Sequence, residues 1–334
     1  MARRFHTGFE HGHLGQFGTI LGAVAVNSAM PRTGTYAMRV AAAGQGVIYT
    51  LHSEIAEVFL RLGYYYTGHS TTGIPEFFQM YDSDGDAQLC LVRNAATGLL
   101  EVHKGSSSSA IIGTSTRVVP LDGYMCIELH ITVANSGVLQ VKLDGVLDID
   151  LTPDTQATAL SDVQAFRLGS GSVTGAYGYY DDFAINDVAG GAPHNTWIGR
   201  GGIYPDLVAA VGHYADLIAS VGDPWDCVKE VPPNDATYVQ ENAAGKKSTY
   251  VMSGIAPSSG VVSAISVVLR AVLDAPGAGN IAPLVRLGTT DDEGATEGLD
   301  VTVKTVTEIL ELDPDGAAWD ITKVNALEVG AVMR

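Results

Sequence analysis

The sequence has few charged residues and a strong deficit of positive charge. Only 17% of its 334 residues are Asp, Glu, Lys or Arg, against ~25% in typical globular domains. Lys and Arg number 19 against 37 Asp and Glu, which gives a net charge of −18. Because affinity for nucleic acid depends on neutralising phosphates, this balance argues against a nucleic-acid partner. Such a sparsely charged surface suits a protein that stays in contact with neighbouring molecules.

Cysteines and long apolar runs are also scarce. Cys90, Cys126 and Cys227 are an odd number at long spacing, which fits neither a disulfide framework nor a zinc site. No segment approaches the ~20 apolar residues of a membrane helix. Arg3 and Arg4 are not followed by the apolar stretch of a signal peptide. We therefore expect three buried thiols, no membrane insertion, and folding in a reducing cytoplasm.

Alternation of apolar and polar residues dominates the first half of the chain. Apolar side chains occupy every second position in residues 127–133, 139–143 and 147–151. Successive side chains of a strand point to opposite faces, so this pattern is typical of half-buried strands. Asp144-Gly145 separates the last two runs, and an Asp-Gly pair between such runs predicts a β-hairpin.

Short strands of this kind recur roughly every 8–12 residues, which favours sandwiches or jelly rolls. The predicted fold class is all-β, with two β-sandwich (jelly-roll-like) domains and at most one short helix. Residues 186–195 show no apolar–polar periodicity, which predicts a linker. We therefore expect domains at residues 1–190 and 191–334, the second serving assembly or interaction.

Two segments of the second domain have less regular patterns. Residues 204–221 are compatible with either a short helix or irregular strands, because apolar residues at nearly helical spacing are interrupted by Gly212. Residues 261–273 are apolar on both faces. That pattern predicts a strand that is buried centrally or at an interface.

Several stretches of the first domain resemble concanavalin A-like (laminin G-like) jelly-roll domains. They are residues 5–10 (Phe-His-Thr-Gly-Phe-Glu), residues 32–40, and residues 179–187 with the sequence Tyr-Tyr-Asp-Asp-Phe. Further stretches are similar to the second domain of structural proteins in tailed-bacteriophage virions: residues 225–230, 232–239 and 318–330.

The resemblance implies a non-enzymatic virion structural protein that is tail-associated, fibre-like or capsid-decorating. Its expected partners are copies of itself, as a trimer or higher oligomer, and other virion proteins. It would be synthesised and assembled in the host cytoplasm and reside in the virion. The alternative is a carbohydrate-binding or host-recognition module that contacts a host surface glycan. A polysaccharide-cleaving jelly-roll enzyme is a third hypothesis.

Two groups of residues are candidates for a binding site. Asp82, Asp84 and Asp86 fit a polar hairpin turn between two strands, but closely spaced carboxylates could also hold calcium. The spacing does not match an EF-hand. Alternation places Tyr64 and Tyr66 on one strand face. Their rings could stack against sugars, or they could fill the core with their hydroxyls at its rim.

The remaining candidate is the pair Asp181-Asp182. Adjacent strand residues point to opposite faces, so these two carboxylates are not expected to flank one glycosidic bond. One is expected to bind backbone amides and the other to meet solvent. Serine-nucleophile and phosphate-loop motifs are missing from the sequence. We therefore predict no catalytic residue and no cofactor.

Overall fold

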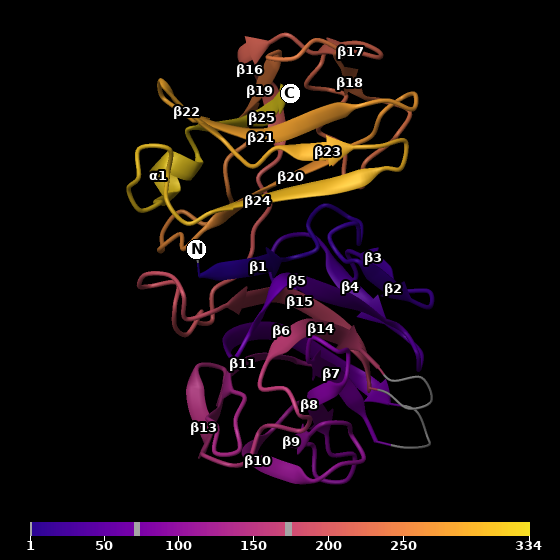
Figure 1. Ribbon diagram of the computed structural model, residues 1–334, viewed down its shortest axis with the longest axis vertical. Helices are drawn as coiled ribbons and strands as arrows, with labels where there is room; N and C mark the ends of the chain where they lie inside the picture. The colour runs from indigo at the N-terminus through magenta and orange to yellow at the C-terminus, as the bar shows by residue number, and fades with distance from the viewer. Residues whose placement is uncertain (1, 70–73, 171–175) are drawn as a thin grey trace. The chain divides into compact units, whose positions relative to one another are not determined.

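The computed structural model describes residues 2–69, 74–170 and 176–334, and its regular secondary structure is almost entirely antiparallel strand (Figure 1). One short helix, α1 (Ile321–Val324), occurs in the described residues. The predicted all-β fold class is therefore confirmed. The chain divides into two compact units, one of residues 1–10 and 17–203 and one of residues 11–16 and 204–334. In the described ranges no helix is long and apolar enough to cross a membrane.

The first unit contains two antiparallel sheets. The eight-stranded sheet has the order β13 (Val146–Leu151), β12 (Leu139–Leu143), β11 (Tyr124–Thr132), β6 (Glu57–His69), β15 (Ala176–Asn186), β4 (Ala37–Val40) and β3 (Ala25–Asn27), with β1 (Arg3–Thr7) also paired to β15. The seven-stranded sheet has the order β10 (Ile111–Val118), β9 (Leu99–Lys104), β8 (Ala87–Arg93), β7 (Glu76–Tyr81), β14 (Val163–Gly169), β5 (Gly46–Ile55) and β2 (Thr19–Leu21).

An aromatic core joins the two sheets of the first unit. Tyr64 on β6 stacks on Phe77 of β7 with 4.3 Å between ring centroids. The hydroxyl of Tyr180 on β15 donates a hydrogen bond of 3.0 Å to the Phe77 carbonyl oxygen. Phe183 on β15 meets Phe78 on β7 at 6.4 Å. Because each buried aromatic ring removes roughly 150–250 Å² from water, these contacts hold the sandwich together.

The predicted hairpin is confirmed between β12 and β13. Asp144 and Gly145 have φ values of 51° and 78°, and the flanking strands pair from Leu143 with Val146 outward. Both turn positions thus need positive φ, which Asp and Gly adopt most readily.

A closing segment, residues 194–203, lies on the outer face of the eight-stranded sheet. The Trp197 ring meets Phe59 of β6 at 5.6 Å, and the Lys142 ammonium lies 3.9 Å from the Trp197 ring centroid. The Gly199 amide donates a 2.7 Å hydrogen bond to the Glu128 carboxylate of β11. The first compact unit therefore continues past residue 190 to Ile203.

The second unit contains one larger sheet and two strand pairs. The six-stranded sheet has the order β16 (Val208–Ala215), β19 (Lys247–Met252), β25 (Leu327–Met333), β21 (Gly279–Leu287) and β22 (Thr290–Glu293), with β23 (Glu297–Leu299) also on β21. The strand pairs are β20 (Ile265–Ala271) with β24 (Lys304–Leu310) and β17 (Ile218–Ala219) with β18 (Val239–Gln240).

The β20–β24 ribbon and the α1 region pack on one face of this sheet. Val267 of β20 and Trp319, just before α1, share a buried cluster with Val285 of β21 and Leu327 of β25. The Trp319 indole N–H donates a 3.1 Å hydrogen bond to the Leu310 carbonyl oxygen. The second unit therefore also has a sandwich-like arrangement, with a ribbon as its second layer.

The two irregular segments of the second domain differ in part from the sequence patterns. Residues 204–221 contain the strands β16 and β17, and the one described helix lies at Ile321–Val324. The strand expected across residues 261–273 is shorter and pairs only with β24. Val267 is buried. Val261 is 91% exposed, because it lies before the start of the strand and outside the core cluster.

Loss of the Trp197 ring should destabilise the first unit specifically. We expect Trp197→Ala to lower its free energy of unfolding by about 2 kcal/mol, less than the ~3–5 kcal/mol of a fully buried ring, because Trp197 is half-buried. Hydrogen-exchange mass spectrometry of β6 and β11 peptides in urea would measure the change. Trp225→Ala is the matched control, since Trp225 is also half-buried with a lysine, Lys229, over its ring. Equal protection of β6 in both variants would contradict the prediction.

Candidate functional site

The Asp82–Asp86 run forms a hairpin turn that is closed by its first carboxylate. Asp82 Oδ1 accepts hydrogen bonds from the Asp84 and Asp86 amides at 3.1 and 2.8 Å, and its Oδ2 accepts one from the Thr158 hydroxyl at 2.7 Å. Asp84 and Asp86 are exposed. The described residues contain no group of three or more His, Cys, Asp or Glu side chains that could hold a metal ion. The turn thus accounts for the buried Asp82 without a cation.

Tyr64 and Tyr66 lie in the core of the first unit. Their exposed fractions are 0% and 2%. Tyr64 is stacked on Phe77, as described above, and the Arg93 guanidinium lies 4.2 Å from the Tyr66 ring centroid. The Tyr66 hydroxyl contacts His69. Neither ring is available at the surface to stack against a sugar.

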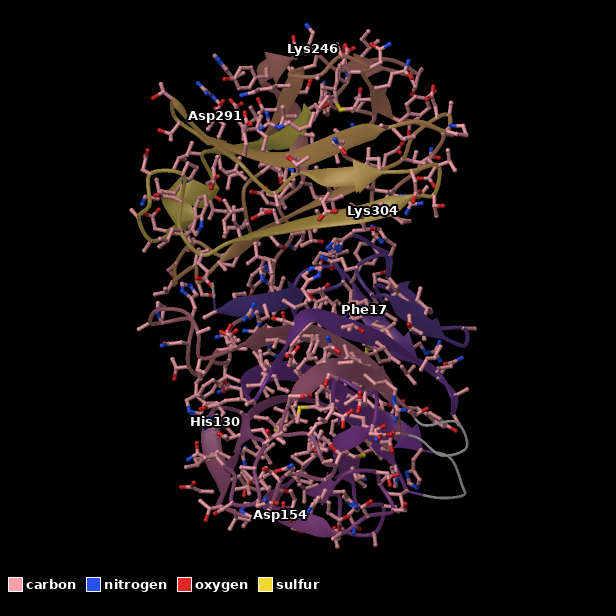
Figure 2. The ribbon with its side chains drawn as sticks, in the orientation of Figure 1. Phe17, His130, Asp154, Lys246, Asp291 and Lys304 are labelled. Atoms are coloured by element: carbon pink, nitrogen blue, oxygen red, sulfur yellow. The ribbon has the colours of Figure 1, made fainter. Side chains whose placement is uncertain are left out.

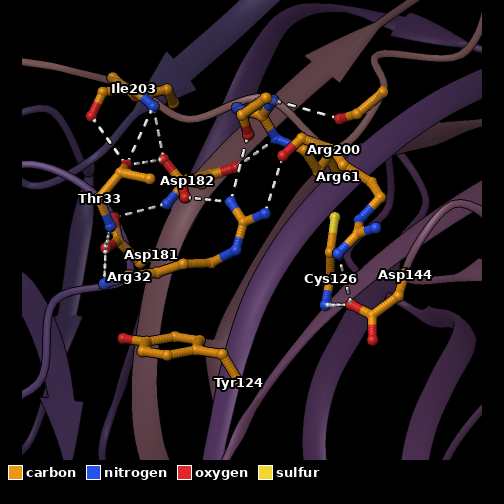
Figure 3. A network of polar contacts seen from close by, with 12 residues as sticks. Arg32, Thr33, Arg61, Tyr124, Cys126, Asp144, Asp181, Asp182, Arg200 and Ile203 are labelled. Carbon is orange, nitrogen blue, oxygen red and sulfur yellow. Dashed lines mark hydrogen bonds and ion pairs between the residues drawn. The ribbon is translucent and has the colours of Figure 1, made fainter. Parts of the chain in front are cut away.

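Asp181 and Asp182 form a buried polar network with the closing segment (Figure 3). Asp182 pairs with the Arg32 guanidinium, and its Oδ1 accepts hydrogen bonds of 2.6 Å from the Thr33 hydroxyl and from the Ile203 amide. Arg32 in turn donates to the Arg200 carbonyl oxygen at 2.8 Å. Asp182 therefore attaches the end of the first unit to its sheet.

The expectation that one of the two carboxylates meets solvent is wrong. Both residues are fully buried. The pairing of β15 with β6 is irregular between Asp181 and Ala184, and Asp182 has φ of 52°. This bulge breaks the simple alternation. Asp181 accepts hydrogen bonds from the Arg32 and Thr33 amides at 2.7 and 3.2 Å, as expected for the other member of the pair.

Polar residues of the seven-stranded sheet form a row across four strands. Arg167 of β14 lies opposite Gln79 of β7, Gln79 opposite Cys90 of β8, and Cys90 opposite His103 of β9. Phe78, which directly precedes Gln79 in β7, is buried in the core. Because successive side chains alternate, the row lies on the outer face of the sheet.

Three more polar residues flank this row. Arg167 forms an ion pair with Glu76, and its guanidinium lies 5.8 Å from the Tyr81 ring centroid. The Tyr81 hydroxyl donates a 2.7 Å hydrogen bond to Gln79 Oε1. We call the following set the outer polar face: Glu76, Gln79, Tyr81, Glu101, His103 and Arg167.

The opposite end of the outer polar face combines an imidazole with a carboxylate. His103 Nε2 lies 3.4 Å from Glu101 Oε2, and Nδ1 lies 3.1 Å from the Ser109 carbonyl oxygen. Glu101 Oε1 also accepts a 2.7 Å hydrogen bond from the side-chain amide of Asn94. The face is therefore a fixed array of donors and acceptors, held by contacts among its members and with Asn94 and Ser109. Glu76, Gln79 and His103 are 4–5% exposed, whereas Tyr81, Glu101 and Arg167 are partly exposed.

A hollow of about 460 Å³ adjoins the outer polar face. Ala87, which lies opposite Tyr81, is one of its lining residues; the others are Asp86, Lys104, Gly105, Ser106, Ser109, Ala110 and Ala157. Lys104 pairs with Asp154, which Figure 2 labels at the end of the first unit. Ser109 joins the two features, because its carbonyl oxygen contacts His103 and it also lines the hollow.

Burial shifts the pKa values of Arg167 and Tyr81, and that of Cys90 in the same row, without bringing any of the three to neutral pH. It lowers the pKa of Arg167 to about 10 and raises the pKa of the Tyr81 phenol to about 12. Burial also raises the pKa of the Cys90 thiol well above its usual value. At neutral pH, Arg167 is therefore charged, while Tyr81 and Cys90 are protonated. Neither of these two can serve as a base or a nucleophile in that state.

The sequence patterns did not single out the outer polar face. Each of its strands carries polar residues at alternate positions, such as Gln79 and Tyr81 in β7, and this was the available signal. Grouping them requires the register between β14 and β7, which are far apart in the chain, and alternation along one strand does not supply it.

Comparisons with known proteins give structural similarity only. No family model matches the chain, and no curated protein matches its sequence. The cellulose-induced protein Cip1 is 16% identical at a TM-score of 0.45, covering 59% of this chain and 100% of that one. Domain 4 of AbnA, an extracellular GH43 arabinanase from Geobacillus stearothermophilus in complex with arabinotriose, is 22% identical at 0.42, covering 56% and 92%.

A third solved structure, an endo-β-1,4-glucuronan lyase from the fungus Trichoderma reesei, is 14% identical at a TM-score of 0.41, covering 55% of this chain and 95% of that one. At TM-scores below 0.5, these similarities carry no argument about ligand or activity. None of the three is described as a virion protein, so the predicted virion role stays a prediction.

The buried Glu10 should make the stability of the first unit depend on pH. Burial raises the pKa of Glu10 from 4.5 to about 7, although hydrogen bonds from the Thr35 and Tyr36 amides oppose the shift. Between these two values the folded state keeps a proton that the unfolded state has lost. This contribution to stability is complete below about pH 4.5 and is lost as the pH rises through 7.

Glu10→Gln mimics the protonated form, so we expect its stability relative to wild type to increase from pH 5 to pH 8. Urea unfolding across this range would measure the difference, with Glu54→Gln on the exposed end of β5 as the control. A constant difference at all pH values would show that Glu10 does not titrate with folding.

Proposed function

We propose that the first unit binds a glycan across its outer polar face and that the protein acts as a recognition module. The observation that carries this proposal is the register that places Arg167 beside Gln79, and His103 one strand further on beyond Cys90, on the outer face of one sheet. Sugar hydroxyls are both donors and acceptors, so they suit an array of amide, guanidinium, imidazole and phenol groups. The adjoining hollow gives room for a further sugar unit.

Binding rather than cleavage fits the state of these side chains. A general base works best with a pKa near the operating pH, but the pKa of Tyr81 is raised to about 12. Arg167 is paired with Glu76, and the Tyr81 proton is donated to Gln79. These groups are therefore engaged in fixing the array, which favours a non-enzymatic role.

Substitution of the central residues should weaken glycan binding without unfolding the unit. We expect Gln79→Ala and Tyr81→Phe each to weaken binding by roughly fivefold to tenfold, since each removes a hydrogen bond worth about 1–1.5 kcal/mol. A glycan array identifies the ligand, and isothermal titration calorimetry measures its affinity. Gln140→Ala, on the eight-stranded sheet, is the matched control. Unchanged affinity in both test variants, or turnover of a polysaccharide, would contradict the proposal.

A second proposed function is self-assembly through the second unit, as the resemblance to virion structural proteins implies. Ile218, Val221 and Tyr238 are 62%, 60% and 48% exposed, and the β17–β18 pairing brings them together, with the Ser220 amide bonded to the Tyr238 carbonyl oxygen. The edge strand β16 contains no Asp, Glu, Lys, Arg or proline. Edge strands of monomers are normally guarded by such residues, so this region favours a homo-oligomer, within a virion or outside it.

Charging this apolar surface should dissociate the oligomer. We expect the double variant Ile218→Glu/Val221→Glu to sediment as a monomer while wild type sediments as a trimer or larger species. Both residues are exposed, so the fold of the second unit should persist, and circular dichroism would check this. Val261→Glu, at another exposed valine, is the control. A wild-type protein that sediments as a monomer would rule out this second function.

A further inference from the structure

The outer polar face carries more carboxylate than cation. Arg167 supplies one positive charge, and its ion pair with Glu76 compensates that charge. Glu101 supplies a second carboxylate beside His103, at 3.4 Å. The face therefore carries two carboxylates, those of Glu76 and Glu101, against the single guanidinium of Arg167. It has no cation in excess.

Arg167 is not free to bind an anionic sugar. The side chains of Arg167 and Glu76 are only 12% and 6% exposed. A carboxylate of a ligand that took the guanidinium for itself would leave the Glu76 carboxylate buried and unpaired. Removal of one partner from a buried ion pair is strongly unfavourable. The ion pair thus acts against anionic ligands and leaves hydrogen bonding as the means of recognition.

The adjoining hollow has the same charge balance. Its single lysine, Lys104, is paired with Asp154, and the carboxylate of Asp86 also lines the hollow. Over the whole chain the net charge is −18, so a polyanion approaching the site would be repelled at a distance as well as on contact.

We infer that the ligand of the outer polar face is a neutral glycan, without uronate, sulfate or sialate groups; this inference rests on the proposed function. Tyr81 and Glu101 are partly exposed, so ligand hydroxyls can meet them without disturbing the Arg167–Glu76 pair. Gln79 and His103, 5% and 4% exposed, position these two side chains. The absence of an excess cation then works as a selectivity filter, because it penalises acidic chains that offer the same hydroxyls.

The test compares neutral and acidic polysaccharides on the full chain. Affinity electrophoresis and calorimetry would use β-glucan, xylan and arabinan as neutral probes and alginate, polygalacturonate and heparin as acidic probes, at low and at physiological ionic strength. We expect at least one neutral probe to bind, with an affinity that salt leaves unchanged, and the acidic probes to bind at least tenfold more weakly.

Two variants test the cause of the selectivity. In Glu76→Gln the Arg167 charge is no longer compensated, so the ratio of alginate affinity to neutral-glycan affinity should rise at least fivefold. Glu101→Gln keeps an acceptor for Asn94 and should raise the same ratio, which covers the case in which Glu76→Gln does not fold. An unchanged ratio in a folded variant would contradict the stated cause.

The outcomes separate this inference from the proposed function. Wild-type binding to an acidic probe that equals or exceeds neutral binding and weakens in salt would overturn the inference, while glycan binding itself would stand. Binding to neither class of probe would overturn both. Neutral binding that is lost in Gln79→Ala supports both together.

Discussion

The register of the strands in the first unit determines its core and its candidate site together. Phe78 and Leu91 lie opposite one another on β7 and β8 and are buried in the core. Because side chains alternate along a strand, the next pair, Gln79 and Cys90, lies on the outer face. A slip of one residue would exchange the two faces of a strand. The apolar core therefore fixes not only the sandwich but also the alignment of the polar row outside it.

Alternation of apolar and polar residues predicts only part of this arrangement. Alternation within one strand predicted the β12–β13 hairpin, because its turn residues and both strands are adjacent in the chain. It assigned Tyr64 and Tyr66 to one face but could not say which face is buried. β6 lies between two neighbouring strands, and the closing segment lies over its outer face. Eight of its 13 positions are buried, including consecutive ones, so alternation does not mark the buried face.

Local patterns also fail where the chain departs from regular geometry. Asp182 adopts a positive φ in a bulge. The types of its neighbouring residues in the sequence do not distinguish it from a regular strand residue. Its partners, Arg32 and Ile203, come from the beginning and the end of the unit. Long-range electrostatic pairing of this kind becomes visible only in three dimensions, since it depends on which distant segments burial brings to one carboxylate.

Scarcity of positive charge connects the two proposed interaction surfaces. Many of the cations of this chain are already committed to carboxylates, as Arg32 is to Asp182, Arg167 to Glu76 and Lys247 to Glu293. Each such pair fixes an element of the fold and leaves little cationic surface for a partner. Recognition of other molecules must then depend on uncharged hydrogen bonding or on apolar contact. The first unit offers the former on a sheet face, and the second offers the latter around β17 and β18, so one compositional constraint accounts for the character of both.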